Sequence, residues 1–223
     1  MDLPKLEEKG ILYQRWLADP NAPSCKVQRT ELTIDDLDTE IEWSSTFSVR
    51  EVPAGPSHAR MTELGLPLRQ YHHMSLKKYV GQDAEIMWEG SVQEGVLFIE
   101  NIAREKDADG PYISEVSIAA YRQVHGTVDG LKHIFVTSII NAETQPLIAR
   151  LCDKSQVNLA KTFEIGTQEY HYLLGSEIGR TVASVLLGAF DRGTVQIPRI
   201  TVWWSGRGRS RHAQAQFDIE HVN

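Results

Sequence analysis

Alternation of apolar and polar residues is clearest near the end of the chain. Residues Arg199–Trp204 and Ala213–Glu220 both alternate with a period of two, which predicts two half-buried strands. The segment between them is short, so the two strands are expected to form an antiparallel hairpin. Leu131–Ile140 (LKHIFVTSII) is rich in β-branched residues and predicts a further strand, and alternation over 41–49 predicts another.

Helical spacing of apolar residues is found in five other segments. The predicted helices are 6–17, 92–104, 115–124 with Ser114 as its cap, 142–151 and 168–190. The second of them follows a capping-box pattern formed by Ser91 and Glu94. The last is apolar nearly all round in its second half, and it is expected to break near Gly175 and to start again with Ser176 as its cap. Gly175 and Gly179 are four residues apart, which would allow close approach of a neighbouring backbone.

Strands and helices do not alternate regularly along the chain, which favours an α+β fold over a doubly wound parallel sheet. We expect one domain over 1–223, with a mixed or mostly antiparallel sheet, helices packed on one face and a C-terminal β-hairpin. Its predicted parts are an N-terminal helix and loop over 1–30, an acidic and mainly helical portion over 31–130, and a sheet-forming portion over 131–223 that contains the buried helix 168–190.

The charge of the chain is unevenly distributed. The 223 residues are 41% hydrophobic and 24% charged, with a formal net charge of −7. Residues 1–110 hold 20 acids and 12 bases, whereas 111–223 hold 10 acids and 11 bases. Six of the acids lie within 31–42. This balance disfavours a dedicated nucleic-acid binder, which would show a basic face; contact with nucleic acid through Arg207, Arg209 and Arg211 stays a minor alternative.

Several kinds of chemistry lack their usual motifs. The two cysteines, Cys25 and Cys152, cannot form a disulfide framework, and no CxxC pair is present to hold zinc. Residues 175–181 (GSEIGRT) resemble a phosphate-binding loop, but the spacing is one residue short and arginine replaces the lysine. We therefore expect no nucleotide, no metal and no other cofactor.

The histidines and the termini add little to this interpretation. His72 and His73 would point to opposite sides of a strand, so they seldom bind one ion together; whether they meet His58 stays open. The N-terminus is charged where a signal peptide is apolar, and the longest apolar run, 181–190, is about half of a membrane span. These features predict a cytoplasmic protein that makes no membrane contact.

The strand alternation also predicts a candidate site. In the two C-terminal strands, the apolar residues share one face, which the buried helix would cover, and the polar residues share the other. A few convergent polar groups beside apolar walls are typical of a pocket for a small organic ligand. Imidazole titrates near neutrality, so His133 would be the acid or base. The predicted site residues are His133, Asp218 and Glu220 for catalysis and Arg199, Thr201, Trp203 and Thr137 for substrate binding.

The leading functional hypothesis is a cofactor-independent enzyme or binder that acts on a small organic molecule by general acid–base chemistry. An isomerase, cyclase or lyase would fit. The alternative is a non-catalytic interaction module that uses the acidic stretch 31–42 or the arginine-rich loop 207–212 to hold a partner. A flat or convex polar face would favour this alternative, whereas a closed pocket would favour the enzyme, and a face that simply meets solvent is also common in such sheets. Assembly into a homo-oligomer stays open.

Overall fold

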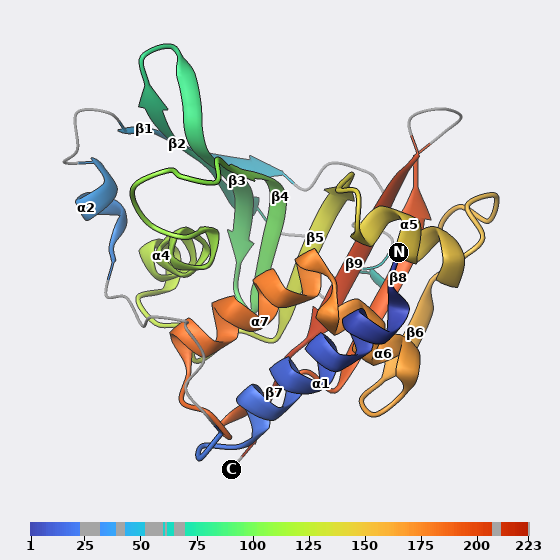
Figure 1. Ribbon diagram of the computed structural model, residues 1–223. Helices are drawn as coiled ribbons and strands as arrows, with labels where there is room; N and C mark the ends of the chain where they lie inside the picture. Colours follow the sequence, from blue (N-terminus) through green and yellow to red (C-terminus); the bar gives the residue numbers. More distant parts are fainter. Residues whose placement is uncertain are drawn as a thin grey trace.

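The computed structural model describes residues 1–22, 32–38, 43–51, 60, 62–64, 70–206 and 211–222. Its centre is an eight-stranded sheet with the strand order β1-β2-β3-β4-β5-β9-β8-β6, beside a small two-stranded sheet of β10 and β7 (Figure 1). The strands are β1 Trp43–Glu51, β2 Gln70–Val80, β3 Asp83–Gln93, β4 Val96–Arg104, β5 His133–Ile139, β6 Lys161–Glu164, β7 Val195–Gln196, β8 Arg199–Ser205, β9 His212–Asp218 and β10 Glu220–His221.

The strand pairing confirms the predicted α+β fold with a mostly antiparallel sheet. Strands β1 to β4 form an antiparallel meander, and β5, β9, β8 and β6 are also paired antiparallel. Strands β4 and β5 are parallel and are joined through a helix, as parallel neighbours must be. The predicted C-terminal hairpin is the β8–β9 pair.

Most of the helices lie on one face of this sheet, as Figure 1 shows for α1, α4, α6 and α7. The helices are α1 Leu3–Ala18, α2 Ile34–Asp38, α4 Ile113–His125, α5 Thr144–Leu151, α6 Gln168–Gly175 and α7 Glu177–Ala189. The predicted break is confirmed, because α6 ends at Gly175 and α7 follows with Ser176 as its N-cap. Asn141 lies two residues before Glu143, the N-cap of α5, and its side-chain oxygen accepts a hydrogen bond from the backbone N–H of Thr144 at 2.6 Å.

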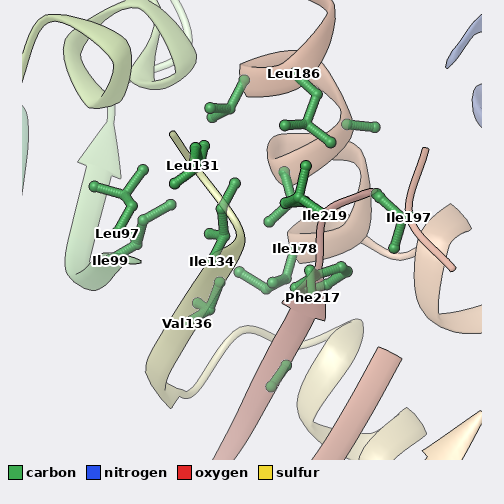
Figure 2. Packing of buried hydrophobic residues seen from close by; sticks show 14 of the residues in the cluster. Leu97, Ile99, Leu131, Ile134, Val136, Ile178, Leu186, Ile197, Phe217 and Ile219 are labelled. Carbon is green, nitrogen blue, oxygen red and sulfur yellow. The ribbon is translucent and has the colours of Figure 1, made fainter. Parts of the chain in front are cut away.

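The main hydrophobic core lies between this helical layer and the sheet. Ile134 and Val136 of β5 and Phe217 of β9 point toward α7, where they pack with Ile178 and Leu186 (Figure 2). Every one of these side chains is buried. The predicted cover of the apolar sheet face by the second half of helix 168–190 is therefore confirmed.

Two glycines allow helix α1 to cross α6 at very short range. A Cβ atom on Gly175 would lie 1.8 Å from the carbonyl oxygen of Leu6, and one on Gly10 would lie 2.0 Å from that of His171. Any larger residue would therefore push the backbones apart. The structure confirms the close approach predicted at Gly175.

The helix predicted over 92–104 is wrong. Asp83–Gln93 and Val96–Arg104 form the β3–β4 hairpin, which turns at Gly95 with a φ of 76°. Ser91 and Glu94 consequently cap no helix. The error has a physical cause: the first four residues of β4 are buried on both faces of the sheet, and such an apolar run fits either a strand or a buried helix. Four strands therefore lie within the portion 31–130, which was expected to be mainly helical.

Some predictions fall outside the described residues. These are the start of the strand at Ile41, positions 31 and 39–42 of the acidic stretch 31–42, and the residues Cys25, His58, Arg207 and Arg209. Within the part that is described, no helix has the length and apolar character that a membrane crossing requires.

Candidate functional site

A group of polar side chains with two buried members, Asp218 and Gln216, lies on the face of the sheet that is turned away from α7. His133 of β5 lies directly opposite Asp218 of β9, and Arg199 of β8 flanks Asp218 on its other side. Gln216 precedes Asp218 on the same face of β9, and Arg60 reaches this face from the segment before β2. We call these five residues the Asp218 cluster.

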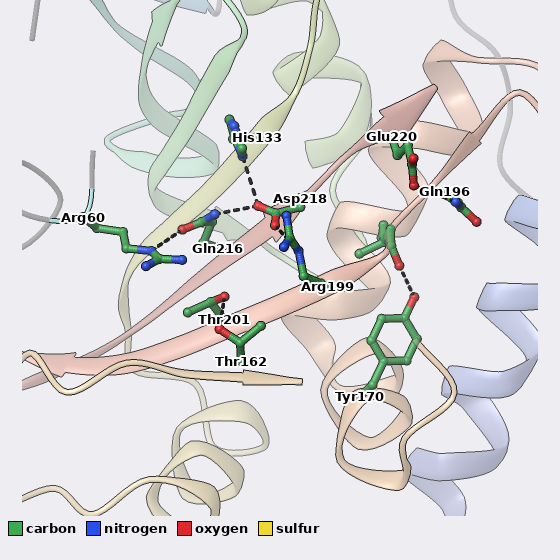
Figure 3. Close-up of polar contacts among 11 residues, drawn as sticks. Arg60, His133, Thr162, Tyr170, Gln196, Arg199, Thr201, Gln216, Asp218 and Glu220 are labelled. Atoms are coloured by element: carbon green, nitrogen blue, oxygen red, sulfur yellow. Dashed lines mark hydrogen bonds and ion pairs between the residues drawn. The ribbon is translucent and has the colours of Figure 1, made fainter. Parts of the chain in front are cut away.

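Both carboxylate oxygens of Asp218 are engaged in this cluster (Figure 3). Its Oδ1 accepts a hydrogen bond from Nε2 of Gln216 at 2.5 Å and lies 3.0 Å from Nδ1 of His133. Its Oδ2 accepts from Nε of Arg199 at 2.9 Å. The carboxylate thus joins an imidazole, an amide and a guanidinium that come from three neighbouring strands.

The surroundings of Asp218 favour its ionised form. The residue is 6% exposed, and burial alone would raise the pKa of its carboxyl group. Hydrogen bonds from His133 and Gln216, together with the charges of His133 and Arg199, outweigh burial and bring this pKa below its ordinary value. Asp218 is therefore a carboxylate at neutral pH.

The amide of Gln216 is held in one orientation by its two neighbours. Its Oε1 accepts a hydrogen bond from Nε of Arg60 at 2.8 Å, so its Nε2 is the atom that donates to Asp218. The second contact of Arg60 is an ion pair with Glu63 at 2.9 Å. Gln216 has no exposed surface, and its hydrogen bonds are therefore not shared with solvent.

The carboxylate of Asp218 also determines which nitrogen of His133 carries a proton. An ionised carboxylate only accepts hydrogen bonds, so the contact at Nδ1 requires the Nδ1–H form of the ring. In the neutral imidazole, Nε2 then carries the lone pair. Within the described part of the chain, no residue forms a hydrogen bond with this Nε2, and the side chain keeps 17% of its surface exposed.

Arg199 is the most accessible member of the cluster. Its side chain is half exposed, and its contact with Asp218 uses Nε alone. The two terminal nitrogens form no hydrogen bond with a described residue. Glu164 lies across from Arg199 on β6, but the two form no ion pair.

An apolar group lies next to the cluster on the same face. Val96, Phe98, Phe135 and Trp203 pack together, and Leu64 and Ala160 cover them partly. The ring of Phe135 is stacked on that of Phe98 and lies 6.5 Å from the ring of His133. Trp203 is 2% exposed, so it fills this group from within and is not an open wall.

The structure brings some of the predicted site residues together and separates others. His133, Asp218 and Arg199 are in direct contact, and Thr201 lies next to them with its hydroxyl 2.9 Å from that of Thr162. Glu220 is in β10, where it accepts a hydrogen bond from Gln196 at 2.8 Å, away from the cluster (Figure 3). Thr137 lines a separate cleft at the far end of β5.

Two members of the cluster were missed by the sequence prediction. Gln216 is on the predicted polar face, but glutamine alone is a weak signal for a site. Arg60 lies 156 residues from Gln216, in a segment rich in proline and glycine that has no periodic pattern. No local signal could have placed Arg60 there, because the contact exists only in the folded chain.

Other chemistries gain no support from the described residues. They contain no group of three histidine, cysteine or acidic side chains that could hold a metal ion. His73 of β2 contacts Glu100 at 3.6 Å, and His72 lies on the opposite side of the strand. Burial raises the pKa of the Cys152 thiol, which disfavours the thiolate that a nucleophile needs.

Comparison with known proteins adds no relative to this picture. No protein-family model matches the chain, and no match was found among curated proteins or solved structures.

Proposed function

We propose that the Asp218 cluster binds a small organic anion and that His133 transfers a proton to or from it. The observation that carries this proposal is the contact of one buried carboxylate with both His133 and Arg199, at 3.0 and 2.9 Å. An isomerase, a cyclase or a lyase without cofactor would use such a site. No nucleotide or metal is required by this chemistry.

The contact with Asp218 supports His133 as the acid or base. The carboxylate holds the ring in the tautomer that has its lone pair on Nε2, and it stabilises the imidazolium that forms when Nε2 takes up a proton. Gln216 holds the carboxylate in place by donating to it, and Arg60 in turn fixes the amide of Gln216. A proton-transfer group needs this kind of fixed orientation.

Arg199 supplies the charge that would attract an anionic substrate. A guanidinium whose terminal nitrogens are accessible can bind a carboxylate or phosphate through two parallel hydrogen bonds. The bond from its Nε to Asp218 fixes the side chain next to His133. The substrate would thus be held by its charged group while a C–H group close to that charged group meets the imidazole.

Proton exchange in D2O tests this proposal without knowledge of the natural substrate. Small 2-oxo acids, beginning with 2-oxobutyrate, carry both a carboxylate and a weakly acidic C–H group. His133 would take the proton from carbon 3, leaving an enolate, and a deuteron from solvent would then return to the same carbon. Proton NMR follows the loss of the carbon-3 signal.

Three variants separate the expected roles. We expect His133→Gln to abolish the enzyme-dependent exchange, a loss of about 10²-fold or more. Arg199→Gln should raise KM more than it lowers kcat, because it removes a binding contact. Arg150→Gln changes an exposed arginine on α5 and should have no effect. Exchange that is equal with and without protein, or equal in wild type and His133→Gln, would contradict the proposal.

A further inference from the structure

A cleft opens at the other end of β5, where the parallel strands β4 and β5 separate. Their pairing runs from Val96 opposite His133 to Ile99 opposite Val136 and stops there. Strand β4 continues along β3 to Arg104, so one edge of its last part has no partner strand among the described residues. The gap between the two strands forms a cleft of about 360 Å³.

The chain topology explains why the cleft forms at this place. After β4 the chain enters α4, which packs on β3 and β4, whereas after β5 it enters α5, which packs against β9 and α6. The two connections thus leave in opposite directions (Figure 1). In open sheets, parallel strands with diverging connections leave a crevice beyond their carboxyl ends, and ligands bind in such crevices.

The lining of the cleft combines an apolar base with an acidic rim. Ile99, Val136, Ile139 and Ile178 are all buried and form the apolar part. The polar lining residues are Glu100, Asn101, Thr137, Ser138, Asn141, Glu177 and His212. The described lining contains two carboxylates but no lysine or arginine.

The two carboxylates differ in the contacts that they already form within the protein. Glu100 accepts a hydrogen bond from Ser91 at 2.9 Å and lies 3.6 Å from His73. The side chain of Glu177, in the first turn of α7, is exposed and forms no hydrogen bond or ion pair with a described residue. Glu177 is therefore the acidic group at the cleft that is most available to a ligand.

The backbone at the cleft has an unusual conformation at one residue. Ser138 has a φ of 55°, in the left-handed region that residues other than glycine seldom adopt. It lies at the irregularity where the pairing of β5 with β9 shifts between Val136 and Ile139. Strained residues of this kind cluster at functional sites, because the fold must hold them against their own preference.

We propose that this cleft binds a small organic amine, with the ammonium group at Glu177 and the apolar part on the isoleucine-rich base. The charge of the described lining favours a cation, and the volume is near the lower end of the range for small-molecule pockets. This site is separate from the Asp218 cluster: it lies at the end of β5, whereas His133 is the first residue of that strand.

The probe for this proposal is 2-phenylethylamine, and 2-phenylethanol is its uncharged counterpart. Both are titrated into uniformly ¹⁵N-labelled protein, and amide NMR signals report the site and the dissociation constant. We expect the amine to shift the signals of Ile99–Ile102 and Val136–Asn141 and to bind at least tenfold more tightly than the alcohol. We also expect added salt to weaken binding of the amine.

Matched variants identify the charge that is responsible for amine binding. Glu177→Gln should weaken amine binding about five- to tenfold and leave alcohol binding unchanged, and Glu100→Gln should have a smaller effect. The control Glu8→Gln removes an exposed carboxylate on α1 and should change nothing. His133→Gln should also leave amine binding unchanged, which separates this proposal from the function proposed above. Equal affinity for amine and alcohol, shifts outside the cleft, or full binding by Glu177→Gln would overturn the proposal.

Discussion

The two faces of strand β9 show how differently one buried strand can be used. Toward α7, the strand presents Ala213, Ala215 and Phe217, and each is at most 2% exposed. Toward the other side it presents Gln214, Gln216 and Asp218, which are at most 6% exposed. The same backbone therefore buries an apolar row on one face and a polar row on the other.

The difference matters because the two rows contribute differently to folding. Burial of apolar surface stabilises the fold directly, whereas burial of polar groups costs free energy that their hydrogen bonds only offset. One atom of the polar row, Oε1 of Gln214, is buried and forms no hydrogen bond with any residue that the structure describes. Stability alone does not explain why such a polar row is buried, whereas a role in binding or proton transfer would explain it. The predictions below test this contrast.

The largest loss is expected on the apolar face. Phe217→Ala removes a fully buried ring from the core beneath α7 and should lower the free energy of unfolding by about 3–5 kcal/mol. Urea denaturation followed by circular dichroism measures this change. A loss below about 1 kcal/mol would mean that Phe217 is not packed as described.

A second large effect is expected where the helical layer is held together. Gly175→Ala places a methyl group 1.8 Å from the carbonyl oxygen of Leu6, so α1 and α6 must separate. We expect Gly175→Ala to lower the free energy of unfolding, by an amount near the upper end of the range of about 1–3 kcal/mol. Gly126→Ala is a useful comparison, because a Cβ there meets no atom within 4 Å, although the left-handed φ of 71° adds its own strain. Equal unfolding midpoints for wild type and Gly175→Ala would contradict the close crossing.

A smaller and pH-dependent effect is expected on the polar face. Asp218→Asn replaces a carboxylate, which only accepts hydrogen bonds and here faces three donors. It should lower the free energy of unfolding by about 1–3 kcal/mol at pH 7. The pKa of Asp218 is lower in the folded protein than in the unfolded chain, where it is about 3.9. The charge of Asp218 therefore stabilises the fold above about pH 3.9, and this stabilisation is lost as the pH falls through the folded-state pKa. The difference in the free energy of unfolding between wild type and Asp218→Asn should therefore shrink below about pH 4.

The control for this measurement is Asp107→Asn, which changes an exposed carboxylate outside the cluster. It should leave the free energy of unfolding within about 0.5 kcal/mol of that of the wild type at every pH. A gap between wild type and Asp218→Asn that stayed constant from pH 7 to pH 3 would show that the charge of Asp218 is not what stabilises the cluster.

The smallest effect is expected at Gln214. Gln214→Met removes the buried acceptor that has no partner but also the hydrogen bond from Nε2 to Ser205 at 2.9 Å. These two changes oppose each other, so stability should stay within about 1 kcal/mol of the wild type. A loss of several kcal/mol in thermal unfolding would show that this amide is part of the structural core.

The C-terminal part of the fold could be predicted because its signals are local. The period of two in β8 and β9 identified which residues share a face, and this placed Asp218 and Arg199 on the same face, where the structure brings them into contact. The cap at Ser176 also depends on neighbours in sequence. The close approach at Gly175 was indicated by the local spacing of Gly175 and Gly179, although the backbone that it meets is that of Leu6 in α1. In each of these cases a residue and its immediate surroundings carry the information.

The parts that could not be predicted depend on distant contacts. The first four residues of β4 are buried on both faces, so this apolar run carried no period that would separate a strand from a helix. Glu220 continues the alternation of β9, but Ile219 interrupts the strand and Glu220 pairs with β7. The cleft depends on where two strands separate, which a single sequence does not encode locally.

The most direct test of the Asp218 cluster is an NMR titration that observes His133 and Arg199 together. Side-chain ¹⁵N signals of both residues are followed while 2-oxobutyrate is added to wild type and to Arg199→Gln. We expect Nδ1 of His133 to carry the proton before addition, and the His133 and Arg199 signals to shift with one common dissociation constant. In Arg199→Gln the shift at His133 should be lost. Signals that do not move, or an unchanged response of His133 in Arg199→Gln, would contradict the account.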